Sequence, residues 1–313
     1  MKRQYVNTLQ EGDHVNDYFV ASRKDLRLKQ DGGKFLGMVF KDRTGEIGGV
    51  LWNNATDTAK LFEPGDVVTV RGVIGVFQGR LQIRVETVLP MRPDEYAVED
   101  LVNTPENAKE SLDGLMALLD TVENPPLARL LAAFRGDKAL MEQFATAAAA
   151  KKWHHEYAGG LARHCYEMAR LAVTVCELFP EVDRDILLCG IFLHDIGKLD
   201  EMSHDLFVDY TTPGKLLGHL HIGCRMAEEK MAEAGDFPEA LRMRLLHCIL
   251  SHHGELVNGS PVTPRTLEAV VLHHLDNLDA QATAFARIIR ETREKGQEWS
   301  EYIPLIDRVI WAK

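Results

Sequence analysis

Residues 187–198 read LLCGIFLHDIGK, an uncharged run that ends in His194 and Asp195. An apolar run of this kind is typical of a buried element. Placing an ionised carboxylate directly after it costs free energy unless a cation or another partner neutralises the charge. A divalent metal ion would do so, because imidazoles and carboxylates are natural ligands of such ions. Gly197 allows the helix to end, and Lys198 adds a cation beside the predicted metal site.

Further polar residues interrupt the apolar pattern in the same part of the chain. Twelve of the thirteen histidines lie between residues 154 and 274. The residues that lie on apolar helical segments or at predicted helix ends are His164, His194, Asp195, His219, His252, His253 and Asp276. A single histidine of this kind is more often a hydrogen-bonded core residue. Their long spacing excludes a zinc finger, so helices must bring the ligands of the predicted metal centre together.

The second part of the chain is expected to be all-α. From residue 108 to about residue 293 the apolar residues recur with a helical period of about 3.6. One example is the series Leu127, Leu130, Leu131 and Phe134.

The first part of the chain is expected to consist of strands. Residues 81–86 alternate strictly between apolar and polar side chains, as a half-buried strand does. Similar runs cover residues 35–40, 46–52 and 66–72, and a short helix is predicted within 53–62. Residues 13–90 hold five strand-like runs in all, with the helix between the third and the fourth, and this order is typical of a five-stranded OB barrel.

These patterns predict two domains. An all-β OB-fold barrel is expected over residues 1–93 and an all-α helical bundle over residues 111–298. A polar connector over 94–110 would join them, and a tail over 299–313 would pack on the bundle or on a second subunit of a homo-oligomer.

Charge and composition restrict the partners. The net charge is −11, yet residues 1–95 hold 14 Lys and Arg against 13 Asp and Glu. An acidic chain is a poor candidate for duplex binding over its whole surface, whereas the balanced first domain can hold a nucleic acid strand. Five cysteines without a CxxC pair are typical of reduced thiols. We therefore expect a cytoplasmic protein with neither a secretory signal nor a membrane partner.

The order of the polar motifs resembles the HD superfamily of metal-dependent phosphohydrolases, whose central motif is similar to FLHDIGK at residues 192–198. HHEYAGGLARH at 154–164, ILSHHG at 249–254 and LHHLDNLDA at 272–280 resemble the YhaM family of bacterial 3′→5′ exoribonucleases. That family also places an OB domain before its HD domain, so the resemblance covers nearly the whole chain.

The resemblance implies roles for the polar residues. His164, His194, Asp195 and Asp276 would bind a first metal ion, and Asp195 would bridge to a second ion held by His219 and either His252 or His253. Asp195 and Lys198 would be the catalytic residues, with Lys198 on the scissile phosphate. Asp279 would order a neighbouring group rather than bind metal. So many histidines favour Mn²⁺ over Mg²⁺, with Fe²⁺, Co²⁺ or Ni²⁺ as alternatives and one or two ions per site.

The implied activity is a 3′→5′ exoribonuclease that releases nucleoside 5′-monophosphates from single-stranded RNA, with single-stranded DNA as a further substrate. The OB domain would stack bases on aromatic side chains and hold phosphates with cations. The rings expected to stack are Phe35, Phe40, Trp52 and Phe77, and the cations expected to hold phosphates are Arg23, Lys24, Lys41, Arg71, Arg80 and Arg84. Aromatic residues on strands more often face the core, so each of these rings has that competing interpretation.

Two other functions compete with this one. The first is an HD phosphohydrolase that acts on small nucleotides or cyclic dinucleotides, although an OB domain has little use for such substrates. The second is a nucleic-acid-binding protein without catalysis, which the intact set of buried polar ligands disfavours.

Overall fold

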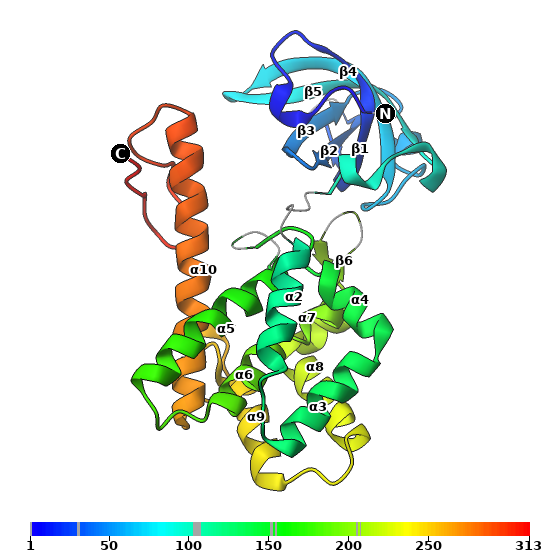
Figure 1. Cartoon of the computed structure of the whole chain (residues 1–313). Coiled ribbons are helices and arrows are strands. Elements are labelled where there is room, and N and C mark those ends of the chain that lie inside the picture. The colour runs from blue at the N-terminus through cyan, green and yellow to red at the C-terminus, as the bar shows by residue number, and fades with distance from the viewer. Residues whose placement is uncertain are drawn as a thin grey trace. The chain divides into compact units, whose positions relative to one another are not determined.

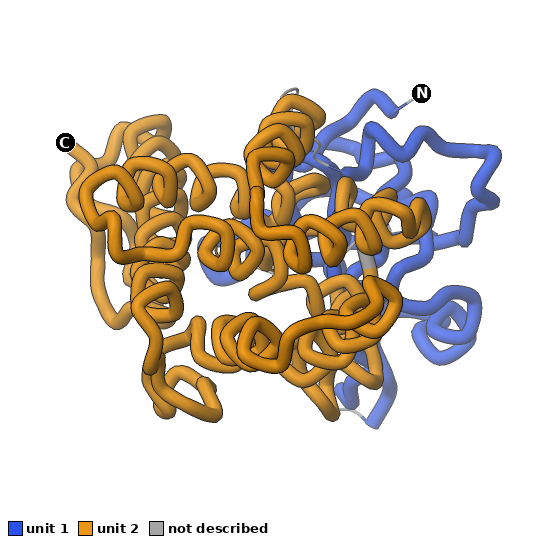
Figure 2. The backbone as a smooth tube through the Cα atoms, turned by 60° about the horizontal axis from the view of Figure 1, so that its bottom comes forward, with its two compact units in different colours: residues 1–104, 205–208 blue, residues 105–204, 209–313 orange. Residues whose placement is uncertain are grey.

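The computed structural model describes residues 2–29, 32–102, 108–150, 153, 155–204, 206 and 208–313, without the side chain of His204. The chain divides into two compact units (Figure 2), one formed by residues 1–104 with 205–208 and the other by residues 105–204 with 209–313. Among the helices in these parts of the chain, none combines the length and apolar character that a membrane span requires.

The first unit is a closed five-stranded barrel (Figure 1) with the strand order β1-β2-β3-β5-β4. Its strands are β1 (His14–Leu28), β2 (Lys34–Asp42), β3 (Gly45–Leu51), β4 (Val67–Phe77) and β5 (Arg80–Pro90). The long strand β1 pairs antiparallel with both β2 and β4, and a parallel pairing of β3 with β5 closes the barrel. The short helix α1 (Ala55–Thr58) lies between β3 and β4. The predicted OB barrel is therefore confirmed.

Alternation along the strands decides which side chains fill the barrel. On β2 the side chains of Leu36, Met38 and Phe40 are buried, and they pack with Val68, Val70 and other apolar residues in one core. The residues that alternate with them on β2, such as Phe35, point outward because successive side chains of a strand face opposite sides.

The segment that follows β5 in the sequence also belongs to the barrel unit. The 3-10 helices η2 (Pro93–Glu95) and η3 (Val98–Asp100) follow β5 in the sequence, and the 3-10 helix η1 (Val6–Thr8) precedes β1. Leu101 is buried against Tyr18, Val20 and Val67 of the barrel. The connector expected at 94–110 thus begins with residues that pack on the barrel, and residues 103–107 lie outside the described part. The predicted domain limits themselves stay predictions.

The second unit is helical. Its helices are α2 (Ala108–Leu119), α3 (Pro125–Gly136), α4 (Lys138–Thr146), α5 (Gly160–Leu178), α6 (Arg184–Leu193), α7 (Lys198–Glu201), α8 (Thr212–Glu233), α9 (Glu239–Ser251), the 3-10 helix η4 (Leu256–Asn258) and α10 (Leu267–Glu294). A small two-stranded sheet of β6 (Met202–His204) and β7 (Val208–Tyr210) is added to the expected all-α fold. From Ile186 to Leu193 every residue of α6 is buried, and α6 packs against α5, α9 and α10. The apolar run before His194 is thus the centre of the bundle.

The C-terminal segment folds back along the end of α10 (Figure 1). Isolated bridges join Trp299 to Trp311 and Ile303 to Arg308, and Arg293 on α10 donates a hydrogen bond to the carbonyl oxygen of Ala312. Within this chain the tail therefore packs on its own helical unit, as one of the two predicted arrangements has it.

Candidate metal centre

Five segments of the helical unit bring the predicted ligands together. His164 lies on α5, His194 and Asp195 follow α6, His219 lies on α8, His252 and His253 follow α9, and Asp276 lies on α10. A break at Gly218, where φ is 72°, separates His219 from the first turns of α8. The turn after Asp195 approaches α8 so closely that a Cβ on Gly197 would lie 2.1 Å from the carbonyl oxygen of His219. Glycine at this position therefore allows Asp195 and His219 to meet.

The first group of side chains consists of His164, His194 and Asp276, whose ligand atoms lie within 4.8 Å of one another. His164 Nε2 lies 3.3 Å from His194 Nε2 and 3.3 Å from Asp276 Oδ1. His194 Nε2 is 3.4 Å from Asp195 Oδ2. Two imidazoles and two carboxylates thus converge on one point.

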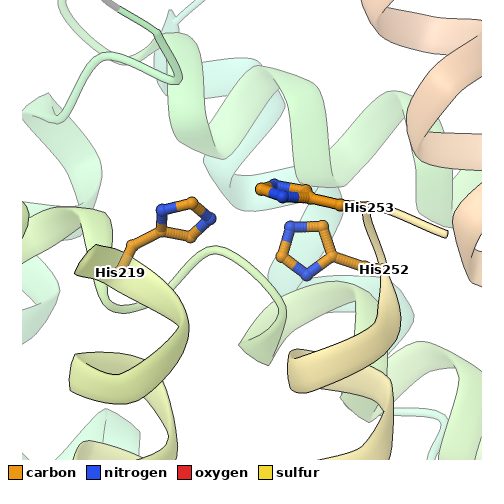
Figure 3. A group of neighbouring side chains, drawn as sticks. All are labelled: His219, His252 and His253. Atoms are coloured by element: carbon orange, nitrogen blue, oxygen red, sulfur yellow. The ribbon is translucent and has the colours of Figure 1, made fainter. Parts of the chain in front are cut away.

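The second group consists of His219, His252 and His253 (Figure 3), whose rings gather between α8 and the end of α9. Asp195 Oδ1 lies 3.5 Å from His219 Nε2 and 3.6 Å from His252 Nε2. One oxygen of Asp195 therefore faces the first group and the other faces the second. Both His252 and His253 belong to the second group, so the choice between them stays open.

In four of the five candidate ligand histidines, the other ring nitrogen is held by an acceptor. Nδ1 of His194 donates to the carbonyl oxygen of Ile191 at 2.7 Å, and Nδ1 of His252 donates to that of Ile249 at 2.8 Å. A carboxylate performs this task for the other two rings. Nδ1 of His219 lies 3.0 Å from Glu201 Oε1, and Nδ1 of His164 lies 2.6 Å from Asp279 Oδ2. Each of these four rings thus turns Nε2 toward the centre, as in protein metal sites.

Sequence reasoning named Asp279 as an ordering carboxylate but missed Glu201. In the sequence Glu201 is one of a pair of adjacent acidic residues, which normally indicates an exposed helix end. No local signal distinguishes Glu201, because its burial depends on how α7 packs against α8.

The protonation states reflect burial and charge. Burial by itself would lower the pKa of His164, but hydrogen bonds to Asp276 and Asp279 outweigh it and raise that pKa to about 10. Burial opposes ionisation of Asp195, yet Lys198 and His194 hold the pKa of its carboxyl well below its usual range. For His252, burial and the neighbouring His194 lower the pKa. The centre therefore combines ionised carboxylates with an imidazole that has an uncharged nitrogen facing inward.

Lys198 lies beside the same carboxylate. Its Nζ is 2.5 Å from Asp195 Oδ2. Burial lowers the pKa of Lys198, but the nearby Asp195 reverses the effect and leaves it raised, so the amine is charged at neutral pH. The predicted contact of Lys198 with a substrate phosphate stays a prediction.

Buried polar atoms in the centre show that its residues fit a divalent cation. Asp195 Oδ1, His219 Nε2 and His253 Nδ1 are buried without a hydrogen-bond partner among the described residues. Such atoms normally have partners, because an unsatisfied buried polar group costs about 1–3 kcal/mol. Imidazole nitrogens and carboxylate oxygens are the ligands that divalent transition metals prefer. The side-chain clusters can therefore bind divalent metal, and nothing in their chemistry selects one metal.

A groove of about 410 Å³ lies on the barrel, outside its core. Its lining includes Phe35, Trp52 and Phe77 of the predicted aromatic residues, together with Arg23, Arg27 and Gln82. The rings of Phe35 and Trp52 stack with centroids 4.9 Å apart. Trp52 is 51% exposed, so its ring can be reached from solvent.

The structure corrects one predicted base-stacking residue. Phe40 is 0% exposed and packs against Phe19 inside the barrel, so its ring cannot stack on a base. Phe35 and Phe40 are five positions apart on β2 and therefore face opposite sides of the sheet.

Of the predicted phosphate-binding cations, Arg23 lines this groove, whereas most of the others do not. Lys41, Arg71, Arg80 and Arg84 are absent from its described lining. Arg71 donates a hydrogen bond to Asn16 Oδ1 on β1. Arg27 and Gln82, which do line the groove, were missed. Both residues lie at outward positions of their strands. No local sequence pattern specifies how these strands are paired in register across the barrel.

Comparison with known proteins agrees with the two-unit structure. Residues 161–281 match the HD domain, and residues 20–91 match the OB-fold nucleic acid binding domain. The chain thus joins a nucleic-acid-binding barrel to an HD domain, a superfamily that depends on divalent metal.

Named relatives match almost the whole chain. The 3′-5′ exoribonuclease YhaM of Bacillus subtilis (strain 168) is 32% identical, over 93% of this chain and 92% of its own length. That of Bacillus licheniformis is 33% identical over 96% of this chain and 95% of its own length. That of Oceanobacillus iheyensis is 35% identical over 90% of this chain and 88% of its own length. The chain belongs to the YhaM family of 3′-5′ exoribonucleases, and the predicted family is confirmed.

Proposed function

We propose that this protein is a metal-dependent 3′→5′ exoribonuclease that hydrolyses single-stranded RNA to nucleoside 5′-monophosphates. The observation that carries the proposal is the placement of Asp195 between two groups of histidines in an HD domain. The relatives named as 3′-5′ exoribonucleases support the direction of degradation and the RNA substrate.

The first metal ion would be held by His164, His194, Asp276 and Asp195. The second would be held by Asp195, His219 and one or both of His252 and His253. When bound, divalent ions would activate water and neutralise the charge of the phosphate that is attacked. We propose Mn²⁺ as the native metal, because histidine-rich sites favour mid-row transition metals over Mg²⁺.

The chain's own groups orient the reaction. Asp195 is acceptor-only when ionised, and its two oxygens face the two groups. Lys198 is charged beside it and is within reach of a phosphate that enters the centre. Backbone carbonyls and the carboxylates of Glu201 and Asp279 keep the imidazole rings from turning. These contacts fix the metal-binding nitrogen and oxygen atoms in place before substrate binds, which reduces the reorganisation that the reaction requires.

The barrel would hold the strand. Exposed Trp52 and Phe77 offer flat apolar surfaces on which unpaired bases can stack, and Arg23 and Arg27 line the same groove as cations for phosphates. A duplex offers no unstacked bases to such a surface, so the substrate is single-stranded. Stacking does not require a 2′-hydroxyl group, which is why we include single-stranded DNA as a second substrate.

Hydrolysis of small nucleotides or cyclic dinucleotides is the less favoured alternative. It leaves the exposed aromatic groove on the barrel without a purpose, and the relatives in hand are named as exoribonucleases.

The decisive experiment is digestion of a 5′-labelled single-stranded RNA with Mn²⁺, followed on a sequencing gel. We expect a ladder that shortens from the 3′ end in the intact protein and disappears with a chelator or in Asp195→Ala. Asp200→Ala is the matched control, because the exposed Asp200 pairs with Arg225 and not with the centre. An intact strand beside cleaved small nucleotides would contradict the proposal, and so would undiminished digestion by Asp195→Ala.

A further inference from the structure

A buried histidine outside both ligand groups lies in the loop before α5. His155 is 4% exposed and has a φ of 47°, in the left-handed region that few residues other than glycine adopt. The loop packs so tightly on the start of α5 that a Cβ on Gly160 would lie 2.0 Å from the carbonyl oxygen of His155. Strained backbone persists only where its surroundings hold it, and it often occurs at functional sites. His154, which begins this motif, lies outside the described residues.

The His155 ring is connected to the first ligand group through one carboxylate oxygen. Asp279 Oδ2 lies 3.0 Å from His155 Nε2 and 2.6 Å from His164 Nδ1. An ionised carboxylate only accepts hydrogen bonds, so His155 Nε2 and His164 Nδ1 must each carry a proton. The proton on Nδ1 of His164 leaves Nε2 as the atom of this ring that faces His194 and Asp276.

Further partners fix the His155 ring itself. Its Nδ1 lies 2.8 Å from the hydroxyl group of Tyr157, and its Nε2 lies 3.4 Å from Glu167 Oε2. The second ligand group has a different support, since Glu201 bonds both Nδ1 and the backbone N–H of His219. The two halves of the centre are therefore oriented by separate sets of residues.

We propose that His155 is a positioning residue for the first metal ion. It holds the Asp279 carboxylate in place, and Asp279 fixes His164 with Nε2 directed at the ion. This inference rests on the proposed function only in requiring that His164, His194 and Asp276 bind metal. Loss of such an outer contact typically lowers metal affinity by about 10–100-fold.

The test measures Mn²⁺ binding to the full chain by calorimetry. His155→Asn suits the left-handed backbone, which asparagine tolerates, but its short side chain cannot reach Asp279. His155→Gln is longer and keeps an N–H donor near the place of Nε2. Each substitution is made in His219→Ala, which leaves the first group intact, and in Asp276→Ala, which leaves the second group intact.

In His219→Ala we expect His155→Asn to weaken Mn²⁺ binding by about 10-fold or more, and His155→Gln to restore most of the affinity. In Asp276→Ala the same substitutions should change the affinity by less than about 2-fold, because His155 does not orient the second group. Circular dichroism melting without metal checks that each variant is folded.

Equal weakening in both backgrounds would overturn the inference, since it would indicate a general structural role. Unchanged affinity of the first group in folded His155→Asn would overturn it as well. The expected binding pattern in a protein that does not cut RNA would refute the proposed function and leave the inference intact.

Discussion

The helical unit buries a charged side chain, whereas the barrel unit exposes an aromatic one. In the helical unit a carboxylate, Asp195, is 2% exposed among apolar helices. In the barrel unit an aromatic ring, that of Trp52, is 51% exposed beside a groove. Each arrangement costs free energy in the isolated chain, because buried charges lose hydration and exposed rings remain in water. In the proposed function, chemistry belongs to the polar core of one unit and strand binding to the apolar surface of the other.

Asp100 shows that the barrel unit also buries a carboxylate, although in different surroundings. Its oxygens accept hydrogen bonds from Tyr5, from Tyr18 and from the backbone N–H of Lys2. Asp195 Oδ1 has no such partner among the described residues. Burial alone therefore does not mark a carboxylate as a candidate metal ligand, whereas an unsatisfied oxygen facing two imidazoles does.

The largest expected effect separates hydrolysis from strand binding. Asp195→Ala should lower the rate of RNA hydrolysis by about 1,000-fold or more, because both proposed metal ions would lose a ligand worth several kcal/mol in the transition state. Its affinity for labelled RNA, measured by fluorescence anisotropy in chelator, should stay within about 2-fold of the original, since stacking on the barrel is untouched. If RNA binding is lost together with hydrolysis, the division of labour between the units is wrong.

The next effect is on the barrel's stability. Phe40→Ala should lower the free energy of unfolding by about 3–5 kcal/mol, because it empties part of the core. Phe35→Ala on the same strand should cost only about 0.5–1.5 kcal/mol, the value of one aromatic contact. Urea unfolding followed by circular dichroism measures both. Equal losses for the two variants would refute the assignment of their opposite faces.

A smaller effect is expected on binding. Trp52→Ala should weaken the affinity for single-stranded RNA by about 1–3 kcal/mol, which is the value of one stacked base. Leu89→Ala is the matched control, because Leu89 is also exposed but lies outside the described lining of the groove. Anisotropy titrations in chelator compare the variants, and an equal loss for Leu89→Ala would remove the groove from the binding site.

The smallest effect concerns Asp100 and its dependence on pH. Burial would raise the pKa of this carboxyl, but hydrogen bonds from Tyr18 and Tyr5 outweigh it and lower the pKa. A lowered pKa in the folded state stabilises the protein above the ordinary value of about 3.9, and the contribution disappears as the pH falls through the folded pKa. Asp100→Asn should therefore cost about 1 kcal/mol at pH 7 and less below about pH 4.

Urea unfolding at several pH values tests the Asp100 prediction, with hydrolysis of RNA at pH 7 as the control. Loss of hydrolysis in folded Asp100→Asn would place this carboxylate in the functional machinery and weaken the distinction from Asp195.

The pattern of apolar and polar residues was enough to name the side chains of the candidate metal centre and the class of domain that surrounds them. Polar side chains such as His194 and Asp195 after a long apolar run are recognisable because their burial requires a partner. Strand and helix periods differ, so the barrel and the bundle were also separable along the chain.

The three-dimensional structure was needed to show how those residues are arranged. Packing between different helices brings the two oxygens of Asp195 to face different groups. It also lets Glu201 support His219, and it connects His155 to His164 through Asp279. On the barrel, alternation places Phe35 and Phe40 on opposite faces, but it does not say which face is the core. A shift of one residue in register exchanges the two faces, and only the closed pairing of all five strands removes that ambiguity.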